Sequence, residues 1–79
     1  GETPGAGVYL SPNPATNELW MRSESGLGNT RLFDWSGNTL MVLDIGNQVT
    51  EMRINISDLP AGIYFVRTAA GAIGKWIKI

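Results

Sequence analysis

Hydrophobic and polar residues alternate with a period of two in several short segments of the chain. The alternation is clearest over residues 48–56, where Met52, Ile54 and Ile56 are separated by polar residues, and residues 17–22 repeat it. A period of two is typical of a half-buried β-strand, because successive side chains point to opposite faces of the sheet. Helical spacing is not sustained over any stretch that is free of glycine and proline. The pattern therefore predicts an all-β chain.

Turn residues divide the chain into seven predicted strands. Ser36-Gly37 and Gly46-Asn47 suit two-residue hairpin turns, because glycine adopts the positive φ that such turns need. We therefore expect residues 29–56 to form a three-strand meander, and Ala70-Gly71 to connect a final hairpin. Seven short strands separated by turns predict a seven-stranded Ig-like β-sandwich of two antiparallel-rich sheets, with a strand order that the pattern leaves open. The predicted strands are residues 8–10, 17–22, 29–35, 38–45, 48–56, 63–69 and 72–79.

Residues 63–66 (IYFV) are apolar at every position, so alternation does not assign them an inner and an outer face. A central strand that is covered on both faces has this composition, and so does a strand that lies at an interface. The second interpretation would allow the chain to form a weak homodimer.

Trp20, Trp35 and Trp76 are each out of phase with a nearby residue that is predicted to face the core, as Ile77 is beside Trp76. We therefore expect all three rings to lie outside the core. There they would either cover the rim of a sheet or serve as flat platforms for sugars. The second possibility gives an alternative function, that of an Ig-like glycan-binding or surface-tethering module.

The composition limits the classes of function. The 79 residues suffice for one domain, which we expect over residues 8–79 after a flexible linker end at residues 1–7 (GETPGAG). The chain has no cysteine, and its net charge of −1 comes with no basic stripe, so nucleic-acid binding is not expected. The longest aliphatic run, residues 40–43, is far shorter than the roughly 20 residues of a membrane-spanning helix. No membrane-spanning segment is predicted.

Few residues could perform catalysis. A serine nucleophile needs a base, and the chain has no histidine, while both of its lysines, Lys75 and Lys78, belong to the last predicted strand. The acidic residues are spread over several predicted elements, as solvated carboxylates usually are, although two of them could converge as an acid–base pair. The sequence contains neither a calcium-binding loop nor a phosphate-binding turn that leads into a helix. We expect no enzymatic activity, no metal and no cofactor.

Four motifs follow one another along the chain: YLSPNPATNEL (residues 9–19), RLFDWSGNTL (31–40), INISDLPAGIYFVR (54–67) and GKWIKI (74–79). Taken alone, residues 59–62 (LPAG) fit a type I β-turn, with proline at the second position and glycine at the fourth. Taken together, the four motifs resemble the C-terminal sorting domain of the type IX (Por) secretion system of Bacteroidota.

This resemblance, which covers residues 9–79, implies a function without catalysis. Domains of this family act as a secretion signal that is recognised by the outer-membrane type IX translocon and its shuttle protein. A surface sortase normally cleaves the domain off and anchors the cargo protein to lipopolysaccharide. The resemblance therefore implies a C-terminal sorting domain at residues 8–79 that is exported through the periplasm to the cell surface or the extracellular space.

The resemblance also implies which positions matter. At the end of the chain, Lys75, Ile77, Lys78 and Ile79 are the expected contacts with the translocon, and the alternative for the two lysines is that they are solvated charges that protect an edge strand from aggregation. The other positions that match the family motifs are expected to be mainly structural: Pro12, Asn13, Pro14, Asp34, Gly37, Asp58, Leu59, Pro60, Gly62 and Tyr64.

Overall fold

The computed structural model describes residues 7–79, so residues 1–6 of the predicted linker end lie outside the described residues. The described chain is all-β, as predicted, and contains no helix that is long and apolar enough to cross a membrane. Its seven strands are β1 (Tyr9–Ser11), β2 (Glu18–Arg22), β3 (Asn29–Asp34), β4 (Thr39–Asp44), β5 (Glu51–Asn55), β6 (Gly62–Arg67) and β7 (Ile73–Lys78).

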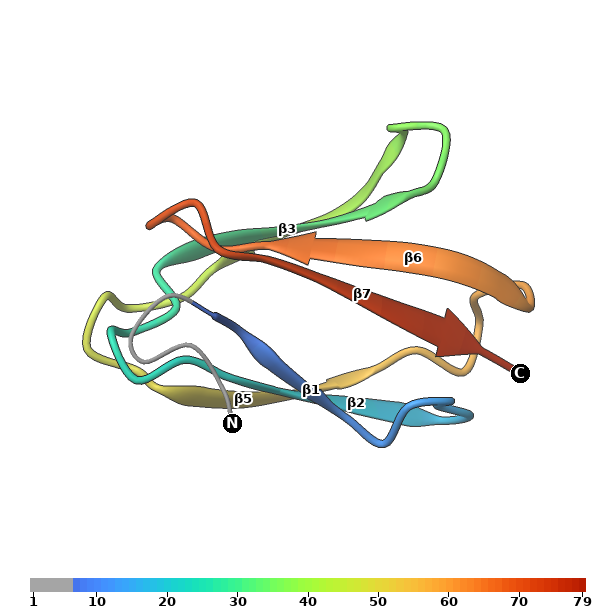
Figure 1. Ribbon diagram of the computed structural model, residues 1–79, viewed down its shortest axis with the longest axis horizontal. Helices are drawn as coiled ribbons and strands as arrows, with labels where there is room; N and C mark the ends of the chain where they lie inside the picture. The colour runs from blue at the N-terminus through green and yellow to red at the C-terminus, as the bar shows by residue number, and fades with distance from the viewer. Residues whose placement is uncertain (1–6) are drawn as a thin grey trace.

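The strands form two antiparallel sheets that face each other as a sandwich (Figure 1). The smaller sheet has the order β1-β2-β5, and the larger sheet has the order β4-β3-β6-β7. The predicted Ig-like sandwich is confirmed. In the larger sheet, β4 lies beside β3. In the larger sheet β6 is therefore a central strand, between β3 and β7.

The predicted three-strand meander is wrong, because β4 and β5 belong to different sheets. The connection between them hydrogen-bonds to the β2–β3 loop, where Leu27 N donates to Val49 O (2.8 Å) and Ser23 N donates to Thr50 O (2.8 Å). A Cβ atom on Gly26 would lie 1.8 Å from the carbonyl oxygen of Asn47, so this close approach requires glycine. Gly46-Asn47 is thus part of a crossing between sheets and not a hairpin turn.

The core lies between the two sheets and contains Trp76, which contradicts its predicted outward position. The Trp76 side chain is fully buried and stacks on Tyr64, its partner in the β6–β7 register, with ring centroids 4.9 Å apart. Its neighbour Ile77 is exposed instead. The sequence did not reveal this phase because β7 carries apolar residues on both faces. The buried apolar residues are Ala15, Leu19, Met21, Leu27, Leu32, Ile45, Ile54, Ile56, Tyr64, Val66 and Trp76.

Candidate functional site

The terminal strand β7 holds the predicted translocon contacts, and the structure divides them between two faces. Lys75 and Ile77 are exposed on the outer side of the larger sheet, and Ile79, just beyond the strand, is 62% exposed. Lys78 has the opposite orientation and is only 9% exposed, with its Nζ donating to the carbonyl oxygen of Ile79 (3.1 Å). The alternative in which both lysines are solvated therefore describes Lys75 only.

The free edge of β7 is covered by residues from the first motif. The Asn13 side chain accepts a hydrogen bond from Ile77 N at Oδ1 (3.0 Å) and donates from Nδ2 to Lys75 O (3.4 Å). Ala15, which is fully buried, donates from its backbone N to Ile77 O (2.8 Å) and accepts from Ile79 N (2.9 Å). We call this arrangement the Asn13–Ala15 clamp, because its four hydrogen bonds satisfy edge groups that would otherwise face solvent.

The prolines of the first motif flank Asn13, the first residue of the clamp. Pro12 and Pro14 lie on either side of Asn13, and both peptide bonds that precede them are cis. Proline has no backbone N–H, so neither residue adds an unpaired donor next to β7. This places Pro12, Asn13 and Pro14, which match the family motif, directly beside the terminal strand.

The third motif forms a tyrosine corner at the start of β6. The hydroxyl group of Tyr64 donates to the carbonyl oxygen of Pro60, four residues upstream, which is the bond that fixes the corresponding corner in Ig-like sandwiches. The hydrogen-bonded turn lies earlier than predicted, because Leu59 N donates to Ile56 O (3.0 Å) and no backbone hydrogen bond among the described residues closes 59–62. Asp58 is exposed within this earlier turn.

The second motif forms the loop between β3 and β4. Asp34 N donates to Asn38 O (3.0 Å) and Gly37 N donates to Asp34 O (2.9 Å), so the loop has three residues instead of the predicted two. Gly37 has a φ of 91°, the positive value that this loop requires. The β6–β7 loop has the same form, with Thr68 at the position of Asp34 and Gly71 at that of Gly37.

The Asp34 carboxylate organises its loop. Its Oδ1 accepts from the backbone N of Asn38 and of Ser36, both at 2.9 Å, and its Oδ2 accepts from Asn38 Nδ2 (3.3 Å). The bond from the backbone of Asn38 contributes most to lowering the pKa of Asp34 below its ordinary value of 3.8. The charged form of Asp34 is therefore part of the folded loop.

The loops of the first three motifs lie at the same end of the sandwich as the C-terminus, with the β3–β4 loop raised above the larger sheet (Figure 1). Ala15 forms a bridge with Lys78, and Lys78 is opposite Gly62 in the β6–β7 register. Two residues further along β6, Tyr64 is opposite Asp34 of β3. Backbone pairing thus connects motifs that are separated by most of the chain at the end of the sheet where β7 ends.

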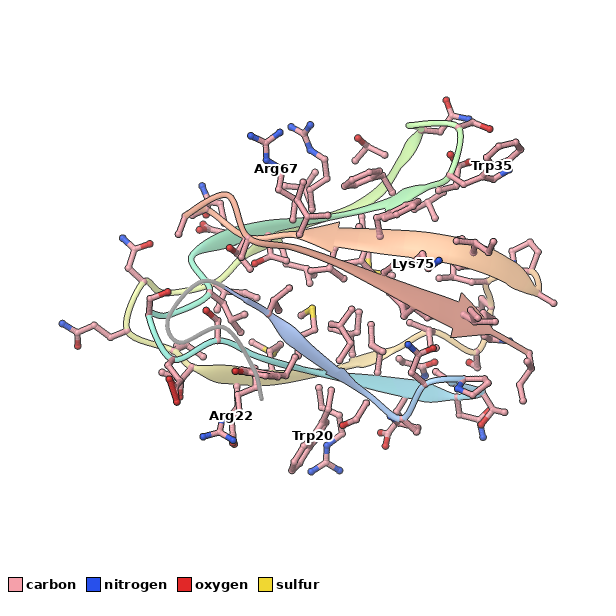
Figure 2. The ribbon with its side chains drawn as sticks, in the orientation of Figure 1. Trp20, Arg22, Trp35, Arg67 and Lys75 are labelled. Carbon is pink, nitrogen blue, oxygen red and sulfur yellow. The ribbon has the colours of Figure 1, made fainter. Side chains whose placement is uncertain are left out.

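The three tryptophans do not form a common platform. Trp76 is in the core, and Trp35 is 76% exposed in the β3–β4 loop. Trp20 lies on the outer side of the smaller sheet, where the guanidinium group of Arg53 is 5.0 Å from the centre of its ring (Figure 2). Within residues 7–79 there is no group of three or more acidic side chains that could hold a metal ion.

The comparison with protein families decides the identity. The model of the secretion system C-terminal sorting domain matches residues 8–79. The chain belongs to this family. As a type IX sorting domain, it serves export by this secretion system to the cell surface or beyond. Comparisons with curated proteins and with solved structures gave no match.

Some residues of the sorting domain were missed by the sequence analysis. Ala15 follows the matched proline motif, but its pairing with β7 depends on a contact across most of the chain, for which local sequence gives no signal. The opposition of Arg31 and Arg67 on neighbouring strands was also missed, because it required the β3–β6 pairing. Only a prediction of strand order could have revealed either feature.

Proposed function

We propose that this sorting domain is a non-catalytic signal that directs its cargo protein from the periplasm through the outer-membrane type IX translocon. A shuttle protein receives it, and a surface sortase cleaves it off and anchors the cargo to lipopolysaccharide. The observation that carries this proposal is the convergence of all four motifs around the end of β7. The geometry supports recognition of a folded surface, because these motifs are adjacent only in the folded chain.

Within this proposal, Lys75, Ile77 and Ile79 are the residues that contact the translocon, because their side chains are exposed at the end of the chain. Lys78 contributes in a different way. Its buried side chain and its bond to the Ile79 carbonyl hold the last residues in place. Pro12, Asn13, Pro14, Asp34, Gly37, Asp58, Leu59, Pro60, Gly62 and Tyr64 preserve the shape that is recognised.

The proposal is tested by fusing residues 1–79 behind a reporter protein that carries a periplasmic targeting signal, in a bacterium with an active type IX system. We expect the reporter to appear at the cell surface or in the medium. Retention of the folded fusion in the periplasm would overturn the proposal. A fusion that lacks residues 75–79 serves as the negative control.

Two lysine variants separate recognition from folding. Lys75→Ala should reduce export of the reporter and leave thermal unfolding nearly unchanged, because Lys75 is exposed and makes no ion pair in the described chain. Lys78→Ala removes a buried side chain and should lower the melting temperature. Full export of the Lys75→Ala fusion would exclude Lys75 as a contact.

A further inference from the structure

The outer face of the larger sheet is unusually apolar for a surface. Phe33 and Phe65 stack on each other at its centre, with ring centroids 5.5 Å apart. Around them, Val42 is 67% exposed and Ile73 is 59% exposed, and Leu40 and Ile63 are exposed as well. Scattered apolar residues on a surface need no explanation, whereas a contiguous group across all strands of a sheet indicates an interaction site. We call these six residues, together with the cations Arg31, Arg67 and Lys75 on the same side of the sheet, the outer face.

Unpaired positive charges accompany the apolar residues. Arg31 of β3 is directly opposite Arg67 of β6, and both side chains are exposed. Like charges in directly opposite positions of a sheet are destabilising. Both ion pairs found in residues 7–79 are on the smaller sheet, so neither Arg31 nor Arg67 nor Lys75 has a carboxylate oxygen within 4.0 Å in the described chain. Figure 2 shows Arg67 towards one end of this face and Trp35 towards the other.

On the outer side of the smaller sheet, in contrast, the arginines form ion pairs. There Arg22 pairs with Glu51 (4.0 Å), and Arg53 pairs with Glu18 (3.9 Å). Arg22 is directly opposite Glu51 in the β2–β5 register, whereas Arg53 is opposite Trp20 and reaches Glu18 diagonally. On this surface each of the two arginines thus has a carboxylate within 4.0 Å. The outer face of the larger sheet has both exposed apolar area and unbalanced charge, which a complementary partner would cover and neutralise.

The charges also indicate which partner fits. A symmetric contact with a second copy would bring the same cations together, which disfavours self-association through this face. Recognition of anionic lipid by basic residues usually uses clusters of about four to eight lysines or arginines, more than Arg31, Arg67 and Lys75 provide. A protein surface with an apolar centre and a few carboxylates satisfies both the stacked phenylalanines and the arginine pair.

We propose that the outer face of the larger sheet docks a protein partner whose apolar surface carries carboxylates that pair with Arg31 and Arg67. This inference rests on the proposed function, under which the partner is a component of the type IX machinery. The docking surface is continuous with the end of β7, because Lys75 and Ile77 belong to the same side of the sheet.

Two matched double variants test the proposal in the exported reporter fusion. Arg31→Gln with Arg67→Gln, and Arg22→Gln with Arg53→Gln, remove the same charge from opposite sides of the sandwich. The first should reduce export about tenfold or more, since each tenfold corresponds to the loss of one modest charged contact. The second should leave export unchanged.

Thermal unfolding of the 79-residue chain makes this test independent of folding. Loss of the Arg31–Arg67 repulsion should leave the melting temperature equal or higher, whereas loss of the two ion pairs should leave it equal or lower. Reduced export of the first variant would thus not be explained by a loss of stability. Normal export of the first variant, or equal loss in both variants, would overturn the docking proposal while the proposed function stands. Retention of the wild-type fusion in the periplasm would overturn both.

Three further measurements test the apolar residues of the outer face and the two alternative partners, which are a lipid surface and a second copy of the chain. Ile73→Ser on the outer face should reduce export, and Val49→Ser in the β4–β5 connection should not. The purified chain should not co-sediment with vesicles of phosphatidylglycerol and phosphatidylcholine. It should not form a dimer that Ile73→Ser weakens in sedimentation equilibrium. Binding to the vesicles that the arginine variant abolishes, or such a dimer, would assign the face to lipid or to a second copy and overturn the proposal.

Discussion

The two edges of the larger sheet are protected very differently. At one edge, the Asn13–Ala15 clamp covers β7 with four hydrogen bonds. At the other edge, β4 pairs only with β3 in the described chain and contains the apolar run of residues 40–43, without proline or lysine. Uncovered apolar edges tend to pair with other strands.

The difference shows that the domain holds β7, and not β4, in place by hydrogen bonds along its outer edge. The clamp leaves β7 no free edge near the C-terminus, so a partner that recognises this strand must contact its outward side chains rather than add a strand beside it. β4 has no such constraint. The protected edge belongs to the strand with the terminal motif, and this is the strand whose shape the proposed function requires.

The largest expected effect comes from introducing the same residue at both edges. Ala15→Asp places a carboxylate at a fully buried position of the clamp and should reduce the free energy of unfolding by about 3 kcal/mol or more. Val42→Asp on β4 is exposed and opposite Arg31, so its effect should stay within about 0.5 kcal/mol. Urea unfolding measures both variants. Similar losses of unfolding free energy in the two variants would show that the clamped edge is no more constrained than the β4 edge.

A smaller effect is expected for Asn13→Ala. The substitution leaves Ile77 N–H without its acceptor and should cost about 1 kcal/mol, the usual range for one hydrogen bond. Amide hydrogen exchange should accelerate at Ile77 in particular. Asn13→Asp retains an acceptor at the same position and serves as the control. Unchanged protection of Ile77 in the alanine variant would contradict the clamp.

The β3–β4 loop, which positions the open edge strand, should respond to pH. Because the pKa of Asp34 is lower in the folded chain than its ordinary 3.8, its contribution to stability is complete above pH 3.8 and is lost as the pH falls through the lowered value. Asp34→Asn should therefore flatten the stability profile in acid. Thr68→Val alters the matching loop between β6 and β7 and should preserve the acid dependence. Thermal unfolding measured from about pH 2 to about pH 6, on both sides of the ordinary pKa of an aspartate, tests the two variants.

The smallest effect on folding is expected for Leu40→Lys at the open edge. Leu40 is 40% exposed, so the change in unfolding free energy should stay within about 0.5 kcal/mol. A lysine on an edge strand discourages pairing with other chains, so weak self-association through β4 should decrease. Light scattering at high protein concentration measures this property. Unaltered scattering would mean that β4 is not where chains associate.

Local patterns predicted much of this fold. β2 and β5 were located because apolar and polar residues alternate cleanly on a sheet with one wet face, and the glycine at position 37 marked a true loop. The failures have a common origin in distant contacts. The Gly46-Asn47 dipeptide has the composition of a hairpin turn, but packing of Asn47 against the β2–β3 loop directs the chain to the other sheet.

The predicted site was limited by the same cause. Trp76 was assigned to the wrong face because the outer face of the larger sheet is itself apolar, so β7 shows no contrast between its two sides. The role of Asn13 depends on β7, which begins at Ile73, 60 residues later in the sequence. The resemblance grouped the motifs by their order along the chain, but only the folded chain shows which strands and loops of these motifs pair with one another.

The Asn13–Ala15 clamp also sets an order of events during synthesis. Its two halves are residues 13–15 and 75–79, which leave the ribosome at opposite ends of this sequence. The first half therefore has no partner until translation has reached Ile79, and contacts between distant residues are slow to form. A product of premature termination before β7 would carry the proline motif without the strand that it holds. The surface around the end of β7 is thus assembled only on chains whose translation has run through to Ile79.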